Sequence, residues 1–395
     1  MTYPNENRKK ITLYSWLMPL IVVVSLGALF AITQKRPQSG DSAPNGFPSD
    51  IIADSIPDPV DLSEYGKSKC MGCHSDQHDD WLPSPHALAA TSEPFSSTFN
   101  HVYDKIGVPK AVQCLECHAP LDSHGGTLDE NGRVQPEAFL SEGISCAVCH
   151  LGKGFVLKST SGLIPTSMHD EALWARRPRN AEFCSNCHNP SHPLMEILTP
   201  DAGFIKPAGN PFMEWLESGY SDDESPNYKA CIDCHGQNGF GTVHNWPGKK
   251  PEIIKSAYSM DFQPYTFDGM RIESSVTITN DGCGHKLPTG DPGHMLTFEF
   301  HIVDERGMAM FMQEYTMVGD MLGDEDTRLA PGEKIQIPLA SPAPANWTPS
   351  LDSLTVKYTV SYSPEPNIRD FLAQIGISSE PLIIEEGLIR IPQAD

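Results

Sequence analysis

The sequence has few basic residues, and this scarcity excludes a surface that attracts nucleic acid. Its 395 residues include 28 Lys and Arg against 51 Asp and Glu, a formal net charge of −23 at pH 7. Five of the basic residues lie in the first 36 positions beside one acidic residue, so the remainder carries 23 basic and 50 acidic residues. Such a surface repels polyanions and favours partners that have basic docking faces.

Cysteine outside one repeated pattern is also nearly absent, which excludes a disulfide framework. Ten of the eleven cysteines form five C-x-x-C pairs, and each pair is followed directly by a histidine. The five pairs are Cys70 and Cys73, Cys114 and Cys117, Cys146 and Cys149, Cys184 and Cys187, and Cys231 and Cys234. The histidines that follow them are His74, His118, His150, His188 and His235. The remaining cysteine, Cys283, is expected to be a small buried apolar residue.

C-x-x-C-H is the attachment signature of c-type haem. Two thiols three residues apart bind the vinyl groups of one porphyrin, and the next residue places an imidazole on the iron as the proximal ligand. Disulfides or zinc clamps would not need the histidines. With 15 His in 395 residues, the odds that a histidine follows all five cysteine pairs by chance are roughly one in ten million. The sequence therefore predicts five covalently bound haem c groups.

Regular apolar periodicity is scarce between Cys70 and His235. This stretch holds 166 residues for five haems, too few for an ordinary side-chain core around each one. We expect the macrocycles to form the core of a pentahaem domain, residues 61–256, with short helices and loops wrapped on them. Short helices are predicted at residues 84–91, 170–176 and 210–218, and neighbouring haems should lie close enough for direct electron transfer.

Charge is absent from residues 11–34, between Lys10 and Lys35. A helix of these 24 residues would span roughly 36 Å, enough to cross a bilayer. A cleaved signal peptide would have a shorter apolar region and a small-residue cleavage site, which is not evident here. The stretch predicts a single transmembrane anchor after a cytoplasmic tail, residues 1–10. Residues 35–60 are rich in Pro, Ser, Asp and Gly and read as a linker.

After residue 256 the haem motifs stop and a period-two alternation begins. The clearest runs are residues 296–302 and 354–362, with weaker runs at 276–279 and 335–339, separated by turns such as Asp304-Glu-Arg-Gly307 and Pro331-Gly332. The pattern predicts that residues 257–395 form an antiparallel β-sandwich of the immunoglobulin-like class.

Each iron needs a second axial ligand unless it is left open for a substrate. Ten histidines lie outside the motifs, twice the number that five bis-histidinyl haems would require. His301 falls on the polar face of a predicted strand and is expected to be exposed. Methionine is an alternative ligand, although no pattern marks any of the 14.

Several short motifs resemble the multihaem cytochromes related to cytochromes c-552 and c-554. Trp81-Leu-Pro-Ser-Pro-His86 is similar to the family's W-x-x-S-x-H, and Cys117-His-Ala-Pro-Leu-Asp-Ser-His124 to its C-H-G-P-x-x-x-H. His244-Asn-Trp-Pro-Gly248 is similar to H-x-F-x-G, and Gly284-His-Lys-Leu-Pro-Thr-Gly290 to G-H-x-x-P-T-G. The resemblance covers roughly residues 65–300.

The resemblance implies distal haem ligands at His86, His124, His244 and His285. His169 is added only from its position between the third and fourth motifs, with His101 and His192 as rivals. The third motif departs from the pattern because no histidine follows it closely, so its partner must come from a distant part of the chain. We expect the β-domain to donate His285 to one iron.

These features predict an electron-transfer protein rather than an enzyme. It would be anchored in the cytoplasmic membrane with its haem and β-domains on the periplasmic or outer side, where haem c is assembled. It would pass electrons between a membrane donor and periplasmic or extracellular redox proteins. The alternative is an oxidoreductase with one open haem that acts on a small nitrogen or sulfur compound. No C-x-x-C-K motif of the kind that marks one family of nitrite reductases is present.

Overall fold

The computed structural model describes residues 71–105, 107, 111, 114–115, 117–120, 143–152, 155–156, 181–188, 209–236, 244–246, 248 and 250–394, the last with gaps at 291–292, 305–306, 320–325 and 344–352. The chain divides into two units, residues 1–53 and 54–395, and every described residue belongs to the second. The expected tail, anchor and linker lie outside the described residues. Within the described ranges, no helix has both the length and the apolar character needed to cross a membrane.

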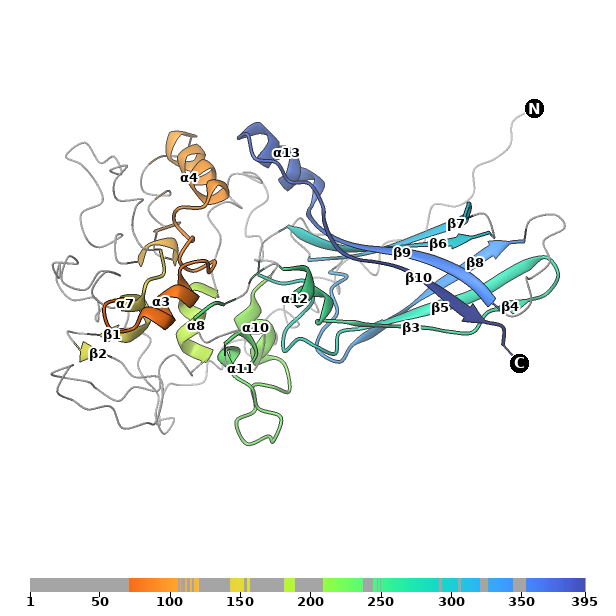
Figure 1. Ribbon diagram of the computed structural model, residues 1–395, viewed down its shortest axis with the longest axis horizontal. Helices are drawn as coiled ribbons and strands as arrows, with labels where there is room; N and C mark the ends of the chain where they lie inside the picture. Colours follow the sequence, from red (N-terminus) through yellow and green to blue (C-terminus); the bar gives the residue numbers. More distant parts are fainter. Residues whose placement is uncertain are drawn as a thin grey trace, which may run out of the picture. The chain divides into compact units, whose positions relative to one another are not determined.

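The described residues of the part that carries the haem motifs include several short helices, as expected (Figure 1). They are α3 (Ser75–Trp81), α4 (Glu93–Lys105), α7 (Cys146–His150), α8 (Ala181–His188), α10 (Pro211–Leu216), α11 (Cys231–His235) and α12 (Pro251–Lys255). A two-stranded hairpin, β1 (Leu151–Gly152) and β2 (Phe155–Val156), follows the third motif.

One of the three predicted helices is confirmed and one is wrong. α10 lies within the predicted residues 210–218, and Asn210 caps it by accepting a hydrogen bond from the Met213 N–H at 3.0 Å. Residues 84–91 form successive turns instead of a helix. The Ser84 hydroxyl accepts the Ala87 N–H at 3.1 Å, as at a helix start. The N–H groups of Ala89 and Thr91 then donate to carbonyl oxygens three residues earlier, so the segment continues as turns. The third, residues 170–176, lies outside the described residues.

Buried side chains are few among the described residues around the haem motifs. One cluster joins six of them, contributed by α4 and the segment around the second motif: Ala90, Phe99, Val102, Ala111, Leu115 and Ala119.

Antiparallel strands follow from residue 259, as the alternation predicted. They are β3 (Ser259–Phe262), β4 (Thr266–Phe267), β5 (Arg271–Thr279), β6 (His294–Val303), β7 (Ala309–Val318), β8 (Lys334–Pro342), β9 (Ser353–Pro364) and β10 (Leu382–Pro392). One sheet has the order β10-β9-β6-β7. In the other, β5 pairs with β8 on one edge and with both β3 and β4 on the opposite edge.

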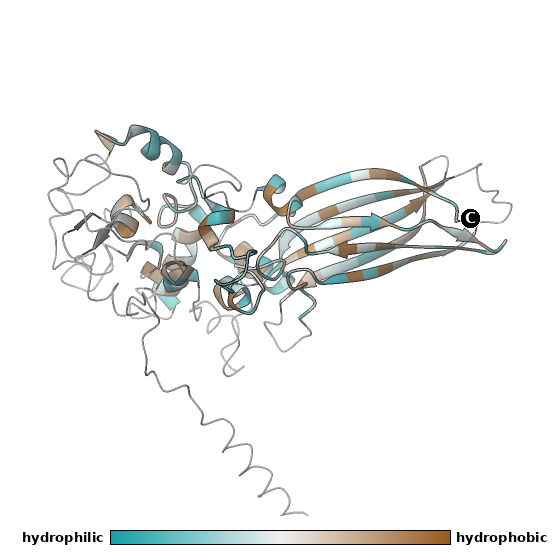
Figure 2. Cartoon of the chain, turned by 90° about the horizontal axis from the view of Figure 1, so that it is seen from below, coloured by the Kyte–Doolittle hydropathy of each residue, from teal (hydrophilic) through white to brown (hydrophobic). Residues whose placement is uncertain are grey.

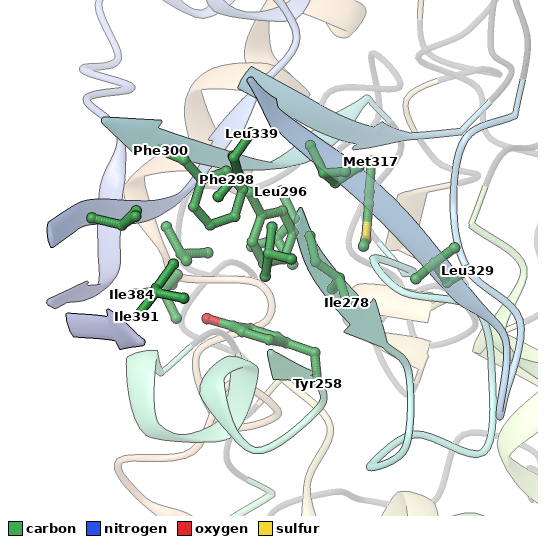
Figure 3. Packing of buried hydrophobic residues seen from close by; sticks show 14 of the residues in the cluster. Tyr258, Ile278, Leu296, Phe298, Phe300, Met317, Leu329, Leu339, Ile384 and Ile391 are labelled. Atoms are coloured by element: carbon green, nitrogen blue, oxygen red, sulfur yellow. The ribbon is translucent and has the colours of Figure 1, made fainter. Parts of the chain in front are cut away.

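The two sheets share one core, because alternate residues of their strands point to the same side. Figure 2 shows this alternation as hydrophobic and hydrophilic residues that succeed one another along each strand. On β6, Leu296, Phe298, Phe300 and Ile302 are all fully buried. They pack with Ile278 of β5, Leu339 of β8 and Ile384 and Ile391 of β10, as Figure 3 shows. The cluster holds 21 buried residues, so this part of the chain has an extended apolar core.

A helix interrupts the β-domain between β9 and β10. α13 (Pro366–Gln374) buries Ile368 and Phe371, and the Phe371 ring meets the ring of His101 on α4 edge-on, with centroids 5.2 Å apart. His101, a rival candidate ligand, therefore contributes to packing between the haem region and the β-domain.

Candidate haem-binding site

Three of the C-x-x-C-H motifs lie in described helices. α7 and α11 coincide with the third and fifth motifs, and α8 ends with the fourth. In a helix, residues three and four positions apart lie on the same face, so the two thiols and the imidazole of each motif project to one side. In α11, the Asp233 carboxylate accepts the Ala230 N–H at 2.9 Å and fixes the first turn. This geometry suits attachment of one porphyrin per motif.

Cysteines of different motifs lie next to one another. The Cys184 thiol of the fourth motif is hydrogen-bonded to Cys231 of the fifth, and the Cys187 thiol is hydrogen-bonded to Cys117 of the second. The fourth motif therefore lies between the second and the fifth. Cys149 of the third motif is half-buried, and desolvation raises the pKa of its thiol to about 11.

Two pairs of imidazole rings face each other across a gap of similar width. The ring centroids of His86 and His188 are 6.3 Å apart, and those of His235 and His285 are 6.1 Å apart. A metal–nitrogen bond is about 2 Å long and each nitrogen lies about 1 Å from its ring centre, so two imidazoles on one metal have centres about 6 Å apart. Both pairs therefore have the ring-centre spacing of an iron held between a motif histidine and a predicted distal histidine.

Hydrogen bonds orient two of the candidate ligands. The His285 ring Nδ1 lies 2.9 Å from the Lys286 carbonyl oxygen, and the His118 Nδ1 lies 2.8 Å from that of Ala89. Because a carbonyl oxygen only accepts, Nδ1 carries the proton in both rings and Nε2 is left as the metal ligand. Phe95 of α4 stacks on His118 with centroids 4.3 Å apart and holds the ring plane.

These imidazoles are also neutral, as iron ligands must be. Burial, reinforced by neighbouring histidines, lowers the pKa of His86 and of His235 to about 4. Burial likewise lowers the pKa of His118, His188 and His285 below the ordinary value. The donor set therefore fits haem iron in position, tautomer and protonation.

For the remaining predicted site residues, the described structure gives only a local position or none. His74 precedes α3, and His244 is half-buried in a turn two residues before Trp246, whose ring centre lies 5.4 Å from that of His86. Cys70, His124, His169 and the rival His192 lie outside the described residues, as does the side chain of His150.

Three further residues have structural explanations. His301 lies on β6 as expected but is only 21% exposed, and its Nε2 bonds the Glu299 carboxylate at 2.5 Å. Cys283 packs against the core of the β-domain, and burial raises the pKa of its thiol to about 12. His78, on α3, is buried beside Trp81. Among the described residues, no group of three or more His, Cys, Asp or Glu forms a separate metal site.

Sequence reasoning missed the residues that hold the His285 loop, residues 284–290, against the haem region. Glu214 of α10 accepts hydrogen bonds from Thr289 Oγ1 and from Arg328 Nη1, both at 2.6 Å. Nothing in the local sequence of Glu214 or Arg328 marks either residue, because the two are 114 positions apart.

Comparisons with known proteins agree with this geometry. Residues 69–151 match the family described as cytochrome c554 and c-prime. A penta-heme cytochrome c552 from Thermochromatium tepidum has a similar fold, with a TM-score of 0.60 and 18% sequence identity over 82% of this chain and 98% of that one. No curated protein sequence matches significantly.

Two further structures match about a third of this chain. A β-glucosidase from Kluyveromyces marxianus has 14% identity over 35% of this chain and 15% of its own, with a TM-score of 0.14. Spo0M from Bacillus subtilis has 14% identity over 35% of this chain and 50% of its own, with a TM-score of 0.15. These similarities are too weak to carry an argument.

Proposed function

Since the chain is a multihaem cytochrome of the cytochrome c554 and c-prime family, with the fold of a penta-heme cytochrome c552, we propose that it is a pentahaem electron carrier without a substrate-binding iron. In this proposal the ten motif cysteines hold five haem c groups, and the five motif histidines are their proximal ligands. The haems supply the redox chemistry, and the chain positions them and keeps their irons closed.

The observation that carries this proposal is the pairing of imidazoles across iron-sized gaps. His86 faces His188, and His285 faces His235, at ring-centre distances of 6.3 and 6.1 Å. An iron with an imidazole on each side has no position left for a substrate. His124, His169 and His244 are proposed as distal ligands of the other three haems.

The neighbouring sulfur atoms support rapid transfer between haems. Cys184 contacts Cys231, and Cys187 contacts Cys117, so the fourth attachment site adjoins both the fifth and the second. Porphyrins attached to adjoining sites lie close to each other, which favours direct transfer without a mobile carrier. The fourth haem would then connect the second and the fifth.

The proposal extends to the location of the protein and its partners. Residues 11–34 would anchor the chain in the cytoplasmic membrane, with the haem domain (61–256) and the β-sandwich domain (257–395) on the periplasmic or outer side. The donor would be a membrane component and the acceptors would be redox proteins with basic docking faces, because the chain carries 51 acidic residues against 28 basic ones. A variant that lacks residues 11–34 but has a cleavable export signal should be recovered in the soluble periplasmic fraction with all its haem.

A low-temperature electron paramagnetic resonance spectrum of the oxidised holoprotein tests the carrier function. The proposal expects only low-spin ferric signals, which integrate to five haems per chain. A high-spin signal that integrates to one haem would contradict it and would favour the alternative, an oxidoreductase with one open haem for a small nitrogen or sulfur compound. Carbon monoxide binding to the reduced protein is an independent measure of an open iron.

A further inference from the structure

Hydrogen bonds from the β-domain hold the His285 loop, residues 284–290, at several of its residues. The His285 carbonyl oxygen accepts a hydrogen bond from the Asn280 side chain at 2.9 Å, and the Leu287 N–H donates to the Leu329 carbonyl oxygen at 3.0 Å. Arg328 Nη1 lies 3.3 Å from the Pro288 carbonyl oxygen. The backbone on both sides of the candidate ligand therefore has little freedom to move.

The same loop is tied to the haem region through a buried carboxylate. The Glu214 side chain, only 8% exposed, uses Oε1 to accept from Arg328 and Oε2 to accept from Thr289 at the end of the loop. α10, which carries Glu214, is itself linked to the fifth motif, because Trp215 Nε1 donates to the Lys229 carbonyl oxygen at 2.8 Å, two residues before Cys231. Glu214 thus connects the segment that holds the proximal His235 to the loop that carries His285.

Two more charges complete the network on the β-domain side. Arg328 is 7% exposed and makes a two-pronged contact with Asp326, at 2.9 Å from Nε and 3.0 Å from Nη2. Asp326 also accepts from Lys286, the residue after His285, at 2.8 Å. Two acids and two bases therefore alternate around the loop, and the formal charges of the network cancel.

A buried ion pair of this kind contributes specificity of geometry more reliably than it contributes stability. Removing water from a carboxylate and a guanidinium costs several kcal/mol for each ion, and their attraction recovers this only in good geometry. Hydrophobic residues would pack the same space without that cost. The retained charges need another explanation, and their contacts all converge on the loop that presents His285.

We propose that Glu214 and Arg328 are a positioning pair for the fifth haem: they fix the distal imidazole of His285 against His235, and their opposite charges set the electrostatic environment of that iron. The inference depends on the proposed function, because it takes His285 as a haem ligand. The Glu214 carboxylate contacts Thr289 and the Arg328 guanidinium contacts Pro288, four and three residues after His285, so both charges act on the loop that carries the ring.

Spectroelectrochemical titration of Glu214→Gln and Arg328→Gln holoproteins tests the electrostatic part. Loss of a negative charge destabilises the ferric state, so the midpoint potential of one haem in Glu214→Gln should rise, and in Arg328→Gln it should fall. In the double variant, the fraction of the fifth haem that stays low-spin should have a potential close to the wild-type value, and the other four haems should be unchanged. Shifts of the same sign in both single variants, or no shift in either, would overturn the inference.

A matched control separates positioning from simple attachment of the two regions. Phe371→Ala removes the other contact named above between them, the one with His101, and does not touch the His285 loop. The inference expects more high-spin iron or carbon monoxide binding in the double Gln variant than in Phe371→Ala. Equal effects would mean that the network only joins the two regions. If a single variant does not fold, the double variant still provides this test, because it leaves no uncompensated buried charge.

A second reference distinguishes failure of this inference from failure of the proposed function. If His285→Ala has the wild-type spectrum, His285 is not a ligand and the proposed function loses one of its two closed irons, which overturns the inference with it. If His285→Ala opens one haem but the Gln variants change neither potential nor spin state, the ligand assignment stands and the positioning role is wrong.

Discussion

Alanine at His86 and at His285 should open two different haems, one for each variant. The two histidines face different motif histidines, His188 and His235, across gaps of 6.3 and 6.1 Å. Truncation to alanine leaves a space the size of an imidazole beside each iron, which water or carbon monoxide can enter. Water is a weaker ligand than imidazole, so the affected iron should change from low to high spin.

The expected magnitude follows from the number of motifs. Each single variant should convert one haem in five, and the double variant should convert two in five, because each histidine is paired with the histidine of a different motif. Spin quantification by electron paramagnetic resonance measures the ferric form, and carbon monoxide titration measures the ferrous form. His301→Ala is the matched control, since His301 bonds Glu299 on β6 and should leave all five haems low-spin.

Two results would refute the reasoning. If the double variant opens only one haem, His86 and His285 serve the same iron and the pairing described above is wrong. If His285→Ala retains the wild-type spectrum, the β-domain donates no ligand from this loop, and the fifth position must be filled by His101, His192 or His294.

Four other outcomes are expected. A pyridine haemochrome assay should find five haems per chain, bound through thioethers; three haems, or haem that acid acetone extracts, would contradict the motif interpretation. Electron transfer to a basic partner cytochrome should slow as the salt concentration rises, because screening shortens the reach of the protein's electrostatic field to about 8 Å at physiological ionic strength. A rate that does not depend on salt would show that the acidic surface does not guide docking. Phe298→Ala should lower the free energy of unfolding of the β-domain by about 3–5 kcal/mol in denaturant titrations, since Phe298 is fully buried. Met308→Ala, at a 67% exposed position, should change it little. A similarly small change in both variants would place Phe298 outside the core. Burial opposes ionisation of Asp326, but Arg328 and Lys286 outweigh it and lower its pKa to about 2, so its contribution to stability is complete above pH 4 and is lost as pH falls toward 2. Asp326→Asn should remove up to about 2 kcal/mol at pH 7 and flatten the loss of stability between pH 4 and pH 2, and an unchanged acid unfolding profile would contradict this.

The sequence predicted the strands that are central in a sheet better than the strands at its edges. β6 and β9 alternate strictly because one face of each lies in the core, and both were predicted. β7 was missed because it is an edge strand in which Met317 alone is fully buried, so its composition does not alternate. β10 was missed because its alternation is broken by a bulge between Ile383 and Glu385.

Some residues of the candidate site follow from local sequence patterns, and others depend on contacts between distant segments. The haem attachment residues follow from C-x-x-C-H because one helical turn contains the whole chemical requirement. The position of His285 in a stiff loop at the start of the β-domain was also predicted. Its partner His235 and the Glu214–Arg328 pair depend on contacts between distant segments, which no local pattern contains.

The unequal cores of the two regions imply an order of biogenesis. The 21-residue cluster of the β-domain is large enough to fold by apolar burial alone, whereas the described residues near the second motif contribute a cluster of six, so we expect that region to depend on attached porphyrins. The β-domain is synthesised after the haem region, yet we expect it to fold first. His285 can bind iron only after the fifth thioether pair has formed, so this bond would close the molecule as the final step and would distinguish a completely loaded chain from a partly loaded one.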